Sequence, residues 1–238
     1  WFHDGLGVWL DVSRMRVNAA DFERLEPGFK TAFEAMQQVE AGAIANPDEQ
    51  RQVGHYWLRA PELAPSETVG HHVATEIDQI ERFGKDVLSG AIKAPCGKPF
   101  TDVLWIGIGG SGLGPMLMVR ALKRPNAGLP FHFFDNVDPD GMSTVLAGLG
   151  DRLKTTLVVT VSKSGGTPEP HIGMEQARLR LDAVGGSWPE QAVAITMADS
   201  NLDQQASQQG WLKRFDMFDW VGGRTSITSA VGLLPAVL

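Results

Sequence analysis

The chain has 238 residues, of which 43% are hydrophobic and 21% charged, and its formal net charge is −7. These values are ordinary for a globular protein and allow one large α/β domain, or one domain with a helical extension. They argue against the basic surface of nucleic-acid-binding proteins, and no apolar run is long enough to span a membrane. Because Cys96 is the single cysteine, an internal disulfide is excluded, and a reducing, cytoplasmic location is expected.

The first 95 residues are predicted to be mostly helical. One amphipathic helix is indicated by the three- and four-residue spacing of Phe22, Leu25, Phe29, Phe33, Met36 and Val39. A second is expected to begin at Asn46, which precedes a proline as N-caps often do, and to run through His55 and stop near Pro61. A third is expected to begin at Ser66 and to bury one face, formed by Val69, Val73, Ile77, Ile80, Phe83 and Val87.

A turn-rich stretch at residues 94–99 marks the predicted boundary between a helical segment, 1–95, and a second unit, 96–238. In the second unit, strand-like and helix-like segments alternate. Strands are predicted at 102–108, 130–135, 155–161 and 192–196, and helices at 112–123, 139–149, 168–183 and 200–209. The alternation predicts an α/β fold, a three-layer αβα arrangement around a parallel sheet, which binds ligands at the carboxyl ends of its strands.

The first strand-to-helix junction, residues 106–115, has the glycine-rich sequence IGIGGSGLGP. Backbone N–H groups at such a junction lie at the positive end of the helix dipole and bind anions, so Gly110 and Ser111 are candidate phosphate ligands. Three glycines are also spaced as in the dinucleotide-binding fingerprint, and Asp135 ends the next predicted strand. A nucleotide-dependent oxidoreductase and a turn without a ligand are therefore alternatives.

A later junction, residues 162–169, has the sequence SKSGGTPE. Its candidate phosphate ligands are Ser162, Lys163, Ser164 and Thr167, which offer three hydroxyls and exposed N–H groups. The alternative is a helix start capped by Thr167, and both can hold because a cap uses only one or two donors. Two anion sites at one sheet edge favour a phosphorylated small molecule over a dinucleotide.

A third motif, residues 219–226, has the sequence DWVGGRTS. Two glycines before Arg224 predict a tight backbone that directs the guanidinium into a cleft, and the alternative is an arginine paired with a surface carboxylate. No metal or cofactor is predicted, because the adjacent His71 and His72 face different directions on a helix and no acidic cluster accompanies them. His55 is expected to be a core or interface residue.

The three motifs together resemble those of the phosphoglucose isomerase family, and the stretch 46–59 fits the family too. The resemblance implies two αβα sugar-isomerase (SIS) domains of the flavodoxin-like type, with residues 96–238 as the first, and a homodimer. It also implies the interconversion of glucose 6-phosphate and fructose 6-phosphate, which proceeds by ring opening and proton transfer through a cis-enediolate.

By this resemblance the phosphate is held by four hydroxyls, those of Ser111, Ser162, Ser164 and Thr167. Lys163 would contribute mainly its backbone N–H, and Arg224 would stabilise the enediolate. The family's catalytic glutamate, ring-opening histidine and late lysine follow the third motif and have no counterpart in the sequence. The sequence is therefore expected to be a fragment that ends before the second SIS domain and is inactive alone. A non-catalytic phosphosugar-binding module is the alternative.

Overall fold

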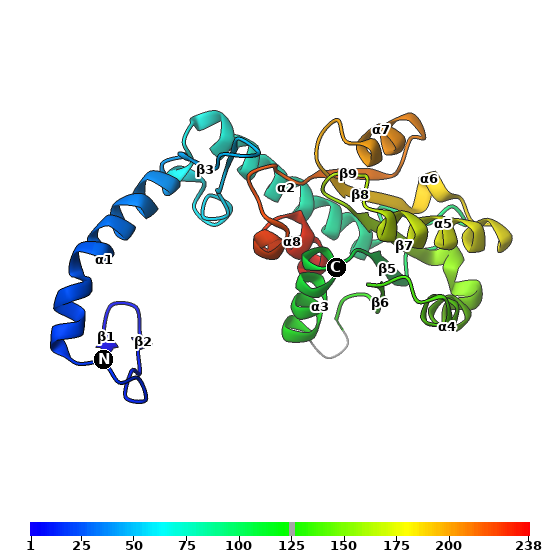
Figure 1. Cartoon of the computed structure of the whole chain (residues 1–238). Helices are drawn as coiled ribbons and strands as arrows, with labels where there is room; N and C mark the ends of the chain where they lie inside the picture. The colour runs from blue at the N-terminus through cyan, green and yellow to red at the C-terminus, as the bar shows by residue number, and fades with distance from the viewer. Residues whose placement is uncertain (124–126) are drawn as a thin grey trace.

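A five-stranded parallel sheet in the order β6-β5-β7-β8-β9 forms the centre of the computed structural model, which describes residues 1–123 and 127–238 (Figure 1). The strands are β5 (Asp102–Ile106), β6 (Phe131–Phe134), β7 (Thr156–Val161), β8 (Ala192–Thr196) and β9 (Lys213–Asp216). The four predicted strands and the parallel sheet are confirmed. This strand order is that of flavodoxin-like folds, as the resemblance implied.

The sequence does not predict the edge strand β9. Its four residues, KRFD, carry three charged side chains and bury only Phe215. The strand is held by that side chain and by parallel pairing with β8, in the register Ile195 to Phe215. Neither feature leaves an alternating apolar pattern in the sequence, so the strand could not be recognised there.

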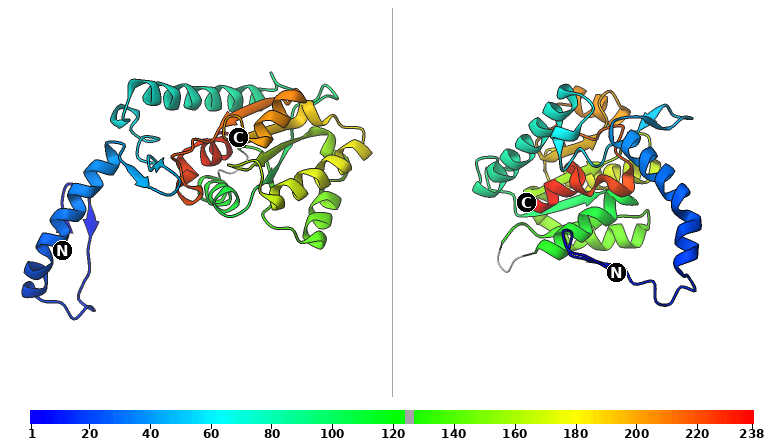
Figure 2. Two further views of the ribbon diagram at one scale, coloured as in Figure 1. Left: turned by 45° about the horizontal axis from the view of Figure 1, so that its top comes forward. Right: turned by 90° about the vertical axis from the view of Figure 1, so that its left-hand side faces the viewer.

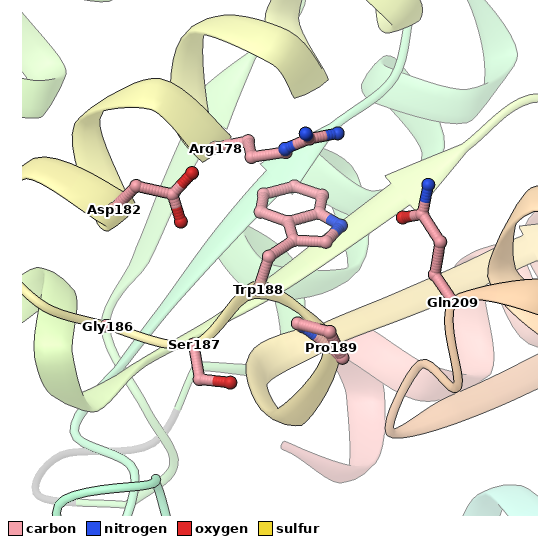
Figure 3. Close-up of a pocket in the computed structure, with 7 residues that line it drawn as sticks. All are labelled: Arg178, Asp182, Gly186, Ser187, Trp188, Pro189 and Gln209. Carbon is pink, nitrogen blue, oxygen red and sulfur yellow. The ribbon is translucent and has the colours of Figure 1, made fainter.

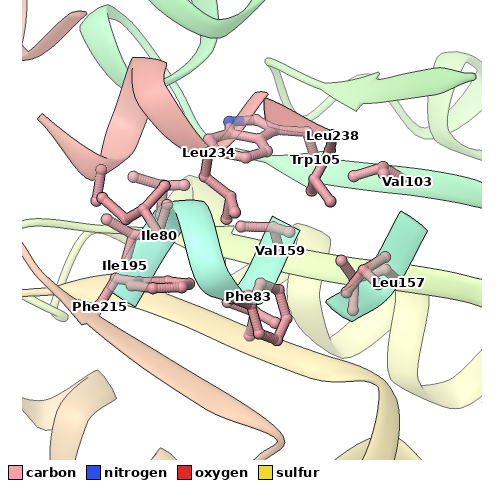
Figure 4. Close-up of a cluster of buried hydrophobic side chains, with 14 of the residues drawn as sticks. Ile80, Phe83, Val103, Trp105, Leu157, Val159, Ile195, Phe215, Leu234 and Leu238 are labelled. Carbon is pink, nitrogen blue, oxygen red and sulfur yellow. The ribbon is translucent and has the colours of Figure 1, made fainter. Parts of the chain in front are cut away.

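Helices cover both faces of the sheet, which confirms the αβα prediction (Figures 1 and 2). One face carries α2 (Glu67–Ser89) and α8 (Ala230–Val237), whose apolar side chains bury Trp105 and Val159 (Figure 4). The other carries α4 (Pro139–Leu149), α5 (Pro168–Ala183) and α7 (Asn201–Gln208), which pack on Leu104 and Val158. The remaining helical elements are α3 (Gly110–Leu122), α6 (Trp188–Gln191), η1 (Pro61–Leu63), η2 (Gly150–Thr155) and η3 (Gly223–Thr228).

Helix starts are the best-predicted features of the chain. The Asp138 side chain accepts from the N–H groups of Asp140 and Gly141, and α4 has the predicted bounds. Helix α2 begins as predicted, after Ser66, whose Oγ accepts from Val69 N–H at 3.3 Å. Although α2 precedes the predicted boundary at residue 95, it shares the core of the sheet.

The N-terminal residues form an arm that projects from the α/β body (Figure 2). Its parts are a hairpin, β1 (Phe2–His3) and β2 (Val8–Trp9), and the predicted helix α1 (Ala19–Glu40). A capping box formed by Asn18 and Asp21 starts α1, but no residue of this helix is buried. Nothing in the described chain is a helix long and apolar enough to cross a membrane.

The helix predicted from Asn46 is wrong, because this stretch forms β3 (Ile44–Asn46), a turn and β4 (Arg51–Gln52). The Asn46 Oδ1 accepts from Glu49 N–H at 3.1 Å, the same local bond that a helix N-cap would make. Gln50 then adopts a φ of 52°, which turns the chain back instead of continuing a helix. His55 follows in a turn, half-buried against the ring of Tyr56.

Candidate functional site

Two of the sequence motifs follow neighbouring strands at the centre of the sheet. Residues 106–115 follow β5 and residues 162–169 follow β7, and these strands pair in register, Ile106 with Thr160. The chain leaves β5 toward β6 and returns to β7 on the other side, so the two motifs lie where the strand order reverses. In open parallel sheets that switch point is where ligands bind, at the carboxyl ends of the strands.

The first junction turns tightly because its glycines pack on one another. A Cβ at Gly112 would lie 2.5 Å from the Gly107 carbonyl oxygen, and Gly109 has a φ of 59°. Trp105 holds the start of α3 by donating its Nε1–H to the carbonyl of Ser111 at 2.8 Å. Helix α3 therefore begins at Gly110, two residues earlier than predicted, and Ser111 lies half-buried in its first turn.

The second junction is held by contacts with the end of β8 and the start of α7. Thr196 Oγ1 donates to the carbonyl of Ser162 at 2.6 Å, and Met197 N–H donates to that of Lys163 at 3.1 Å. Gly165, with a φ of 68°, packs so closely that a Cβ there would lie 2.5 Å from the backbone nitrogen of Leu202. The loop is therefore fixed before any ligand binds.

The two junction helices lack the side-chain caps that other helices have. Of the helices of eight or more residues in the described chain, five have an N-cap side chain that accepts from backbone N–H groups of the first turn. The capping residues are Asn18, Ser66, Asp138, Ser200 and Ser229. Helices α3 and α5 have none. Thr167 is the N-cap residue of α5 as predicted, but it makes no capping bond, so its hydroxyl stays available to an anion. Few N–H groups are free at these helix starts, because residues 168 and 170 of α5 are prolines, and in α3 the N–H groups of Ser111 and Gly112 donate to the carbonyls of Ile108 and Gly109.

Lys163 joins the second motif to the third. Its Nζ donates to the backbone carbonyls of Asp219 at 2.6 Å and Val221 at 2.8 Å. Burial, followed by the charge of Arg51 on β4, lowers the pKa of Lys163, while Asp219 and Glu49 oppose that shift. The side chain therefore does more than the sequence predicted, which was a contribution mainly from the backbone N–H.

The first motif meets the third at a glycine. A Cβ at Gly110 would lie 1.9 Å from the Gly223 carbonyl oxygen and 3.0 Å from the Arg224 nitrogen, so only glycine permits this contact. The three motifs thus converge at one edge of the sheet. Neither this contact nor those of Lys163 could be predicted from the sequence, because each joins residues more than fifty positions apart.

Arg224 itself is exposed in η3, the turn that begins at the second of the two glycines. Within residues 1–123 and 127–238 it forms no ion pair and no hydrogen bond through its guanidinium. The alternative reading of Arg224 as a surface ion-pair residue therefore finds no partner in this part of the chain. Its guanidinium can engage a negatively charged ligand at this edge.

Other candidate groups play structural roles. The Nε2 of His72 lies 2.8 Å from Asp216, and no group of three or more potential metal-binding side chains occurs where the structure describes the chain. The carboxylate of Asp135 accepts from Asn136 at 2.8 Å. A hollow of about 530 Å³ around Trp188 and Asp182 lies near the start of β8, at the opposite edge of the sheet from the motifs (Figure 3).

Comparisons with known proteins identify the family of the chain. Residues 11–238 match the Phosphoglucose isomerase family. Over all 238 residues the chain is 73% identical to the Glucose-6-phosphate isomerase of Parasynechococcus marenigrum (strain WH8102) and covers 43% of that protein. It is 74% identical to that of Synechococcus sp. (strain CC9605) and covers 45% of it. The chain thus spans less than half the length of these curated relatives.

Solved structures show the same fold. The crystal structure of a glucose-6-phosphate isomerase from Chlamydia trachomatis is similar with a TM-score of 0.78 and 30% sequence identity, over 93% of this chain and 43% of that one. A hypothetical protein from Thermus thermophilus is similar with a TM-score of 0.69 and 29% identity, over 96% of this chain and 48% of that one.

Proposed function

Since the chain belongs to the phosphoglucose isomerase family, we propose that it supplies the phosphate-binding part of a glucose-6-phosphate isomerase. In this proposal residues 1–95 are the helical segment and 96–238 the first SIS domain. The substrate phosphate is bound at the two strand-to-helix junctions, by Gly110, Ser111, Ser162, Lys163, Ser164 and Thr167. For the whole protein we further propose a cytoplasmic homodimer that needs no cofactor.

The convergence of three motifs at the switch point is the observation that carries this proposal. Support comes from the hydroxyls of Ser111 and Thr167 and the N–H of Glu169, which lie at two helix starts without side-chain caps and suit a dianion, although the chain as a whole is negatively charged. The local groups therefore have to supply the attraction that the overall field does not. The close approach of Gly110 to Gly223 supports this proposal, because the segment that carries Arg224 then lies next to the first junction.

Arg224 is proposed to act at the reactive end of the sugar. After ring opening, a proton moves between C2 and C1, and negative charge develops on the enediolate oxygens. A guanidinium in a fixed position stabilises that charge more in the transition state than in the ground state. The carboxylate base that moves the proton is proposed to follow Arg224 in the whole protein, outside residues 1–238, so these residues alone bind without turnover.

Binding and turnover measured on the 238-residue chain test the proposal. Calorimetric titration should detect fructose 6-phosphate and much weaker binding of fructose, which lacks the phosphate, and NAD should not compete. The double variant Ser162→Ala/Thr167→Ala should weaken fructose 6-phosphate binding at least about tenfold, since hydrogen bonds to a charged ligand contribute roughly 1.5–3 kcal/mol each. A matched control, Thr31→Ala/Ser89→Ala, removes two exposed hydroxyls elsewhere and should bind as the wild type.

Two outcomes would contradict the proposal. Equal affinity for fructose and fructose 6-phosphate would show that the chain does not bind the phosphate group. Strong isomerase activity of residues 1–238 would show that the catalytic base lies within them. A non-catalytic phosphosugar-binding module is the second candidate, and it predicts the same binding. Replacing Arg224 by Lys separates the two, because only the isomerase requires tighter binding of an enediolate-like phosphorylated acid through the guanidinium.

A further inference from the structure

Two buried hydroxyls at the carboxyl end of β7 have no protein partner. The side chains of Thr160 and Ser162 belong to residues that are 1% and 6% exposed. Thr160 Oγ1 and Ser162 Oγ make no hydrogen bond to any described residue. Because the residues are two positions apart along an extended chain, both side chains leave the same face of the sheet. Leaving one buried hydroxyl unpaired is costly, and two adjacent ones point to a shared partner.

The same two side chains line a small cavity beneath the loop that follows β7. Its volume is about 10 Å³, which is room for one water molecule and far too little for a phosphate or a sugar. Met174 of α5 and Leu202 of α7 close its sides, and Gln205 adds a further polar group. A buried water needs two to four polar partners, and this cavity supplies them.

The cavity is bounded by parts of the chain that are already fixed. The carbonyl of Ser162 accepts from Thr196 Oγ1, and the tip of the loop at Gly165 rests on the first turn of α7. No backbone group of the described residues forms a hydrogen bond with either hydroxyl. A water molecule is therefore the partner that fits both the volume and the polarity.

We propose that one water molecule bridges Thr160 Oγ1 and Ser162 Oγ, and that Thr160 thereby positions the Ser162 hydroxyl for a phosphate bound at loop 162–167. A hydroxyl has one proton to donate and lone pairs to accept with. The water donates to Ser162 Oγ, so the Ser162 proton is not used inside the cavity, and the hydrogen bonds of the chain strengthen one another. Thr160 is a positioning residue, and this second half of the inference rests on the proposed function.

The water site is tested without any ligand. Crystals of the ligand-free chain that diffract to about 1.5 Å or better should show a density peak within about 2.7–3.2 Å of both hydroxyl oxygens. Thr160→Ser should keep the peak, and Thr160→Val, which has the same shape without the hydroxyl, should lose it. A wild-type cavity without density would overturn the inference, whether or not the valine variant folds.

The positioning role is tested by affinity for fructose 6-phosphate. Thr160→Val should weaken binding about three- to tenfold, and Thr160→Ser should stay within about twofold of the wild type. Thr31→Val on the exposed arm is the matched control, and melting curves establish that each variant is folded. Wild-type affinity in Thr160→Val would refute the role. If the wild type itself does not bind, the proposed function fails and the positioning role with it, whereas the density peak is judged independently.

Discussion

Replacing Lys163 by methionine tests whether this side chain holds the third motif in place. The change removes the ammonium that donates to the carbonyls of Asp219 and Val221 but keeps a long apolar side chain of similar reach. The two carbonyls differ in surroundings, since Val221 is fully buried and Asp219 is exposed. Water can therefore replace the ammonium at Asp219 but not at Val221.

The expected loss of stability follows from that difference. A buried carbonyl left without a donor costs about 1–3 kcal/mol, and one that becomes hydrated costs little. Burial disfavours the charged form of Lys163 and lowers its pKa, so removal of the charge offsets part of the loss. The free energy of unfolding should thus fall by about 2 kcal/mol in Lys163→Met.

Urea denaturation followed by circular dichroism measures this loss, and hydrogen exchange localises it. Amide exchange should accelerate in residues 219–226, and the affinity for fructose 6-phosphate should fall with it. Lys85→Met is the matched control, because Lys85 is exposed and forms only a 3.4 Å pair with Glu81, and it should change stability by less than about 0.5 kcal/mol. If Lys163→Met is equally stable and exchanges normally in 219–226, the reasoning is refuted.

The lowered pKa also fixes how this difference depends on pH. Between the pKa of Lys163 in the folded protein and its ordinary value of 10.5, the unfolded chain binds more protons than the folded one. Stability contributed by this group therefore rises with pH through that window. The stability gap between wild type and Lys163→Met should widen as the pH increases toward 10.5, and a narrowing gap would contradict the direction of the shift.

Three further predictions concern other parts of the structure. Burial raises the pKa of Glu76 to about 7 from 4.5, so the folded protein binds more protons in that window and this group's contribution to stability falls as the pH rises. The free energy of unfolding of Glu76→Gln, measured by urea denaturation, should therefore exceed that of the wild type by about 3 kcal/mol at about pH 8 and match it near pH 4. Equal values at both pH values would contradict this. Gly110→Ala places a methyl group 1.9 Å from the Gly223 oxygen and should lower both the melting temperature and phosphosugar affinity, whereas Gly148→Ala, which meets open space, should lower neither. Asp102→Ala removes a buried carboxylate from its histidine and arginine partners and should lower the free energy of unfolding by about 3 kcal/mol. The ligand affinity of the protein that remains folded should not change, because Asp102 lies at the opposite edge of the sheet from the candidate site.

In the α/β part of the fold, helices and strands could be predicted where the residues of a single segment determine its structure. Helix α4 could be predicted to the residue because Asp138 caps it and a proline follows. The same rule failed at Asn46, where the capping bond to Glu49 forms but the chain turns into β4. A cap satisfies the first N–H groups of either a helix or a turn, so tertiary contacts decide what comes next.

The candidate site was predictable as a set of motifs but not as an arrangement. An anion site could be proposed at each junction from its own glycines and hydroxyls. What joins the motifs is long-range, as in the contacts of Lys163 with Val221 and of Gly110 with Gly223. Such contacts depend on where the third motif lies in the fold. The strand that leads into it, β9, leaves no pattern of its own in the sequence.

The glycines of the first motif can now be separated by what each one permits. Their spacing matched a dinucleotide fingerprint, yet Gly107 and Gly112 pack on each other and Gly110 packs on the third motif. Only Gly109, with a φ of 59° and no atom near its absent Cβ, faces open space. In the dinucleotide fingerprint, too, the first and third glycines serve a tight turn and helix packing, and only the second faces the ligand, so Gly107, Gly109 and Gly112 divide their roles in the same way. The glycine spacing alone therefore does not separate a dinucleotide site from a phosphosugar site. What distinguishes this turn is Gly110, which lies outside the three fingerprint positions and packs on the third motif.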